Sequence, residues 1–132
     1  MQKLTINFVL TSKEMHENKC QVCNLAISTP FGSLSEADHI QGIGSPHFGA
    51  DVIGKLLILC PNHHTVFDNT GWYVQDNWEI IETESNSVIG KLIVLPKHEI
   101  VHSCFVYERN YALKAKSLGK RNWKSLRYSD IA

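Results

Sequence analysis

Two pairs of closely spaced metal-binding residue types constrain this 132-residue chain more than any other feature. Cys20 and Cys23 form a Cys-x2-Cys pair, and Cys60 and His63 form a Cys-x2-His pair further along the chain. Three thiols and an imidazole at this spacing are typical of a tetrahedral structural zinc site. Two disulfides, or cysteines buried independently of one another, are the alternatives.

The chain shows no sign of an oxidising or membrane environment. No apolar segment with a cleavage-site pattern precedes the cysteines, so we expect a reduced, cytoplasmic protein. No apolar stretch approaches the roughly 20 residues that cross a bilayer, which excludes membrane insertion. With 43% hydrophobic residues a domain of this size would have a marginal core, which zinc would stabilise.

The pattern of apolar residues predicts a small α+β fold. Residues 4–10 alternate as a half-buried strand does, and residues 37–40 also suggest a strand. Pro61 occupies the first turn of a predicted short helix that reaches Asp68. The segment 41–54, punctuated by Gly and Pro, is expected to be a long ordered loop of functional importance.

The second half of the chain alternates between short apolar runs and polar turns. We expect strands at 72–74, 79–81 and 89–95, followed by a helix that begins near residue 100. Cys104 falls in that helix and is assigned to the core, and His98 and His102 are assigned to its surface. The whole is predicted to be one domain, 1–132, with a core at about 20–74 and a strand and basic helical extension at 75–132.

Three further residues have the chemistry of a catalytic site. Consecutive helix residues project about 100° apart, so His63 and His64 can serve two different sites from one helix. Asp38 and His39 would alternate to opposite faces of a strand, and they share one cleft only if that strand bends or ends there. Asp68, four residues after His64, either accepts a hydrogen bond that fixes the His64 tautomer or is an ordinary surface acid.

These residue types suit the hydrolysis of a phosphodiester. Asp38 and His64 would bind a hard divalent cation, with water and phosphate oxygens completing its shell as Mg²⁺ prefers. Mn²⁺ suits the same ligands, and Ni²⁺ or Co²⁺ are further candidates. His39 is left as the general base that activates water, because histidine changes charge near neutral pH. A purely structural role for these three residues is the alternative.

The stretch from Cys20 to Val74 resembles the HNH endonucleases, whose core is a ββα-metal finger. Within that family it is most similar to HNH domains linked to SRA domains in modification-dependent restriction enzymes. The segments CQVC, EADHI, GSPHFGAD, LLILCPNHH and FDNTG carry the resemblance.

The resemblance implies the same roles as the chemistry of the residues. Asp38 and His64 match the family's metal ligands, His39 matches its general base, and the Cys3His set matches its structural zinc. One position departs, because Lys55 stands where the family usually has the asparagine that braces the loop near the base. Lys55 either contacts a phosphate or marks a weakened or inactive site.

The charge distribution suggests where nucleic acid would bind. The formal net charge is zero, but residues 114–127 contain six basic residues and no acid. A solvated C-terminal face is an equally good interpretation of this segment. The loop residue His47 is a weaker candidate for contact with DNA. The candidate DNA-binding residues are Lys55, His47, Lys120, Arg121, Lys124 and Arg127.

The sequence therefore predicts a metal-dependent DNA endonuclease that cuts double-stranded DNA. The alternative is a catalytically weak or inactive zinc-containing module that binds nucleic acid without cutting it. Cleavage of both strands suggests a homodimer or two successive nicks. An SRA-type module that reads modified cytosine does not fit in the sequence, which suggests an excised domain, a partner protein or low sequence preference.

Overall fold

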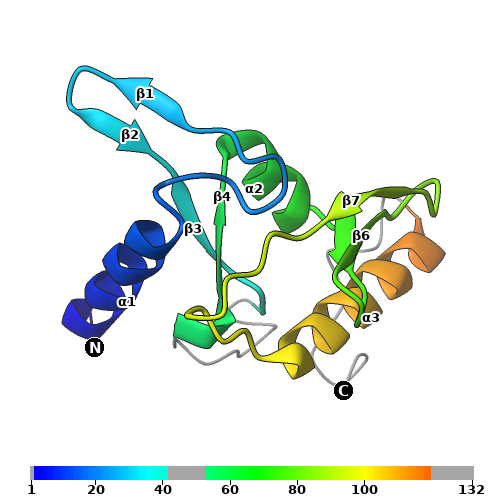
Figure 1. The fold of residues 1–132 in the computed structure, drawn as a ribbon. Helices are drawn as coiled ribbons and strands as arrows, with labels where there is room; N and C mark the ends of the chain where they lie inside the picture. Colours follow the sequence, from blue (N-terminus) through cyan, green and yellow to red (C-terminus); the bar gives the residue numbers. More distant parts are fainter. Residues whose placement is uncertain (1, 42–52, 120–132) are drawn as a thin grey trace.

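The computed structural model describes residues 2–41 and 53–119 (Figure 1). The order of elements in the described residues is α1 (Gln2–Met15), β1 (Ile27–Thr29), β2 (Gly32–Leu34), β3 (Glu36–His39), a 3-10 turn η1 (Ile53–Lys55), β4 (Leu56–Leu59), α2 (Pro61–Asp68), β5 (Trp72–Val74), β6 (Glu79–Glu82), β7 (Val88–Lys91) and α3 (His102–Leu118). All strand pairs among them are antiparallel, which confirms the predicted α+β fold class.

A two-stranded hairpin followed by a helix forms the centre of the molecule. β3 pairs with β4 in the register Glu36↔Leu59 to His39↔Leu56, and α2 follows β4 after Cys60. Every residue of β4 is completely buried, as expected for a short apolar strand covered on both faces. Pro61 begins α2, because its fixed φ suits a first helical turn and its missing N–H costs nothing there.

A three-stranded sheet and the C-terminal helix complete the core. β5, β6 and β7 form a meander in that order, and α3 packs against β5. Figure 1 shows α3, in orange, lying along this sheet, while the β1–β2 hairpin stands away from the rest of the chain. Trp72 of β5 packs against Phe67 of α2 in a tilted arrangement with ring centroids 4.4 Å apart, which joins the sheet to the central helix.

The N-terminal segment folds differently from the prediction. Residues 4–10, predicted as a strand, lie in helix α1, which packs against β3, β4 and η1. Two polar side chains are buried here, Ser12 within α1 and His16 directly after it, so the apolar residues of the segment do not show a helical period. The Ser12 hydroxyl donates to the Phe8 carbonyl at 2.7 Å, which satisfies it inside the helix.

The other predicted elements are largely confirmed. The helix from Pro61, the strands at 37–40, 72–74 and 79–81, and the C-terminal helix are all present. The predicted strand 89–95 ends at Lys91. Most of the predicted loop 41–54 lies outside the described residues.

Of the two histidines assigned to the C-terminal helix surface, His102 is exposed on α3 as predicted, and His98 differs. His98 is not on a helix surface but is buried ahead of α3, where its Nδ1 lies 2.8 Å from Nε2 of His16. His102, the first residue of α3, has its ring 4.4 Å from that of Trp78. Cys104 is buried in the core, as predicted. Across the described ranges, no helix combines the length and apolar character needed to cross a membrane.

Candidate active site and metal centres

The two cysteine and histidine pairs converge on one point. Donor atoms of Cys20, Cys23, Cys60 and His63 all lie within 4.8 Å of one another. Nδ1 of His63 is 3.2 Å from Sγ of Cys60 and 3.7 Å from Sγ of Cys20, and Sγ of Cys23 is 3.9 Å from Sγ of Cys60. These cysteines are free thiols, so the alternative of two disulfides is wrong for them.

These distances fit a tetrahedral zinc ion. With Zn–S bonds of about 2.3 Å, two sulfurs of a tetrahedral site are about 3.8 Å apart. Burial lowers the pKa of His63, which keeps its imidazole neutral as a ligand must be. Burial, followed by the Cys20 and Cys60 thiols, raises the pKa of Cys23 to about 11, so a bound cation is needed to favour the thiolate. The Cys3His cluster can therefore hold a structural zinc.

The two consecutive histidines of α2 do face different clusters. His63 turns to the thiols, and Trp72 Nε1 donates to its carbonyl at 3.2 Å, which fixes this end of the helix. His64 turns to the carboxylates of Asp38 and Asp68, with one donor atom of each of the three residues lying within 4.8 Å of the others. Nε2 of His64 is 3.1 Å from Oδ2 of Asp68 and 3.6 Å from Oδ1 of Asp38.

Glu36 fixes the orientation of His64. Its Oε1 lies 2.6 Å from Nδ1 of His64, so the ring donates from Nδ1 and presents the lone pair of Nε2 to the two aspartates. Three acceptors then face one another, an arrangement that a cation between them would stabilise. The tautomer-fixing contact suggested for Asp68 is thus made by Glu36 on the opposite nitrogen, and Asp68 joins the cation-binding donors.

The burial of Asp38 also favours a cation at this site. Asp38 is 7% exposed, and its Oδ2 has no hydrogen-bond partner among the described residues. Burial, followed by the hydrogen bond and charge of Asp68, raises the pKa of Asp38 to about 9. The ionised carboxylate of Asp38, which a hard cation needs as a ligand, is therefore disfavoured unless a cation is bound.

Asp38 and His39 share a cavity although they are neighbours in a strand. β3 ends at His39, which removes the constraint of strict alternation. The cavity has a volume of about 270 Å³ and is lined by Asp38, His39, Ile40, Phe67, Asp68, Glu108 and Tyr111. A candidate base and two candidate cation ligands thus open into the same space.

Two carboxylates of this region were not identified from the sequence. Glu108 of α3 is 7% exposed, and burial followed by the charge of Asp68 raises its pKa well above the ordinary value. Its position on the buried face of the helix, with Cys104, Tyr111 and Ala115, is a signal that could have revealed it. Glu36 gives no such signal, because an acid at the beginning of a strand is usually a surface residue.

Lys55, the candidate for contact with a phosphate, is partly buried in η1. Its side chain interacts with the buried thiol of Cys104, and it does not line the cavity of Asp38 and His39. Its backbone carbonyl accepts from the N–H of Ile40 at 2.8 Å, which ties η1 to the end of β3 beside His39. The other candidate DNA-binding residues lie outside the described residues: His47, Lys120, Arg121, Lys124 and Arg127.

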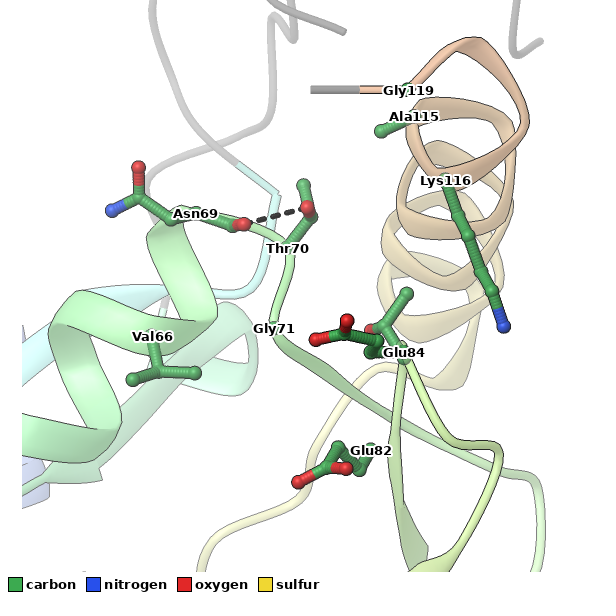
Figure 2. Close-up of a pocket in the computed structure, with 10 residues that line it drawn as sticks. Val66, Asn69, Thr70, Gly71, Glu82, Glu84, Ala115, Lys116 and Gly119 are labelled. Carbon is green, nitrogen blue, oxygen red and sulfur yellow. Dashed lines mark hydrogen bonds between the residues drawn. The ribbon is translucent and has the colours of Figure 1, made fainter.

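A larger cavity lies beyond the end of α2. It has a volume of about 510 Å³ and runs between the Val66–Gly71 region, the end of β6 and the last turns of α3. Figure 2 shows the carboxylates of Glu82 and Glu84 on its wall, with Lys116 on the facing helix. The larger cavity contains neither Asp38 nor His39, so we assign the chemistry to the smaller cavity.

Comparison with known proteins gives one informative likeness. No family model matches the sequence, and no curated protein matches it. A solved structure titled "Modification dependent TagI restriction endonuclease" is 37% identical with a TM-score of 0.76, over 78% of this chain. The matched region is 36% of that longer chain, so this chain spans about a third of its length. The likeness supports a relationship to restriction endonucleases and, at a general level, a nuclease function.

Proposed function

We propose that this chain is a metal-dependent DNA endonuclease domain of the HNH type. The observation that carries the proposal is the junction of two clusters on one helix, with His63 among the thiols and His64 between two aspartates. The likeness to a restriction endonuclease supports nucleic acid as the substrate. The neighbouring base candidate, His39, opens into the same cavity as Asp38 and Asp68.

Each residue has a distinct task in the proposed reaction. Asp38, Asp68 and Nε2 of His64 hold a divalent cation such as Mg²⁺ or Mn²⁺, whose carboxylate and imidazole preferences they match. Bound there, the ion supplies positive charge to the phosphate and to the departing 3′ oxygen. Glu36 keeps His64 in the tautomer that presents Nε2.

His39 carries out the proton transfer. Its imidazole takes a proton from a water molecule, and the resulting hydroxide attacks the phosphorus in line with the P–O3′ bond. That bond breaks, and the products are a 5′-phosphate and a 3′-hydroxyl, the 3′ oxygen taking a proton from solvent. The Cys3His zinc takes no part in the chemistry and holds α2 in place.

Specificity for modified DNA would need a further module. The similar structure is described as modification dependent, and the matched part is 36% of it. We propose that target selection, by an SRA-type domain or another partner, lies outside the region compared, and that two copies of this domain act together on a duplex.

A plasmid assay tests the proposal. Supercoiled plasmid, unmodified and cytosine-methylated, is incubated with zinc-loaded protein and Mg²⁺ or Mn²⁺, and the His39→Ala variant is run beside it. We expect nicking that EDTA abolishes and that falls by at least about 100-fold in the variant, since a positioned base contributes about that much. His102→Ala, a histidine outside the cavity, is the matched control and should cut normally.

Two results would count against the proposal. Cutting that survives His39→Ala would remove the assigned base. Retained DNA binding without cutting under any metal would favour the zinc-containing binding module, for which the Lys55–Cys104 contact in place of a bracing asparagine is the supporting observation.

A further inference from the structure

We propose that Glu108 of α3 is a positioning residue of the cation site, whose carboxylate accepts a hydrogen bond from a water molecule bound to the ion. The inference rests on the proposed function and extends it, because it brings the C-terminal helix into a site otherwise built from β3 and α2. The resemblance from Cys20 to Val74 does not reach this residue.

The placement of Glu108 is the first argument. It lines the 270 Å³ cavity together with Asp38, Asp68 and His39, and it is 7% exposed. α3 is held there by its packing against β5 and by buried residues on the same helical face, including Tyr111 and Ala115. The carboxylate is therefore a fixed part of the cavity wall and not a mobile surface group.

Glu108 lies outside the group of donor atoms that could share one ion, which favours a contact through water. The donors of Asp38, His64 and Asp68 lie within 4.8 Å of one another, and Glu108 is not part of that group. A carboxylate that binds an ion through water sits about 4 to 5 Å from it, the sum of a short metal–oxygen bond and a hydrogen bond. Mg²⁺ keeps several of its waters, so such partners are part of its ordinary binding.

The charge balance gives an independent argument. Among the residues that the structure describes, no basic side chain forms an ion pair with Glu108. Asp38, which faces the same cavity, has a buried oxygen, Oδ2, that finds no hydrogen-bond partner in the described part of the chain. A hydrated cation would compensate three carboxylates around one cavity, because buried acids otherwise lose stabilisation by solvent.

Cation binding to the zinc-loaded protein tests the role without depending on DNA cleavage. Mn²⁺ is titrated calorimetrically into the unaltered protein, Glu108→Gln, Glu108→Asp and Glu84→Gln. We expect about 10-fold weaker Mn²⁺ binding for Glu108→Gln, in the range seen when a residue that orients a metal ligand is lost. Glu108→Asp keeps the charge and should lose less. Glu84→Gln removes an exposed charge outside this cavity and should bind as the unaltered protein does.

The controls separate this inference from a structural effect and from the proposed function. Zinc content and melting temperature are measured for each variant, and equal losses in the Gln and Asp variants would assign Glu108 to packing and overturn the inference. Unchanged affinity in Glu108→Gln would overturn it as well. Should the unaltered protein bind Mn²⁺ and cut no DNA, the proposed function fails, while weaker binding in Glu108→Gln still supports the role of Glu108.

Discussion

Cation binding at Asp38 is expected to release a proton, and this can be calculated from the structure. Burial and the neighbouring Asp68 raise the pKa of Asp38 to about 9 in the metal-free protein. At pH 7 only about one carboxyl in 100 is then ionised, which lowers the apparent affinity about 100-fold, or about 2.7 kcal/mol. The ionised form binds the ion and the protonated form predominates below pH 9, so affinity must rise with pH.

Calorimetric titration of the zinc-loaded protein with Mn²⁺ measures both quantities. Between pH 6 and pH 8 we expect the affinity to increase by roughly 100-fold, about tenfold for each pH unit. At pH 7, titrations in two buffers with different ionisation enthalpies should report about one proton released per ion bound. Asp68→Asn removes the hydrogen bond and charge that help to raise the pKa of Asp38, so its affinity should depend less on pH in this range.

A flat profile would refute this reasoning. If Mn²⁺ binds equally well at pH 6 and pH 8 and no proton is released, then Asp38 is already ionised in the metal-free protein. The cavity would then be wetter than its burial indicates, and the argument that a cation relieves an unfavourable cluster of acids would fail with it.

Three further changes test other contacts of the structure. Glu36→Gln should weaken Mn²⁺ binding about 10-fold or more with zinc retained, because His64 loses the carboxylate at 2.6 Å from its Nδ1. An unchanged affinity in calorimetry would show that this contact does not contribute to cation binding. Removal of zinc by a strong chelator should unfold the domain, since structural zinc contributes folding free energy outright, and circular dichroism would detect a surviving fold. Gly71→Ala would place a Cβ 2.2 Å from Cγ1 of Val66 and should cost about 1 to 3 kcal/mol in denaturant unfolding, whereas Gly90→Ala, with open space around it, should cost less.

The central ββα unit could be predicted because local signals agree there. The apolar run 56–59, the proline at the first turn of α2 and the two metal-ligand pairs all specify the same strand, turn and helix. The separation of His63 and His64 into two clusters follows from helix geometry alone. These features need no knowledge of distant parts of the chain.

The sequence did not predict features that depend on buried polar side chains or on residues far apart in the chain. The sequence predicts a strand in place of α1 because the buried polar side chains, Ser12 within the helix and His16 directly after it, obscure the helical period. Glu108 could not be linked to Asp38 because only the packing of α3 on β5 brings them to one cavity. A glutamate in a helix is ordinarily solvated, so its burial becomes evident only in three dimensions.

The adjacency of His63 and His64 makes the zinc site part of the active site without giving it a chemical role. Asp38 comes from β3, which β4 holds by backbone pairing, but His64 and Asp68 both come from α2. The thiol cluster fixes the beginning of α2 through His63, one residue before His64. Loss of zinc would therefore displace two of the three cation ligands together. A chain of this kind that kept Asp38 and His39 but lost one zinc ligand should bind no catalytic cation, because two of the three cation ligands come from α2.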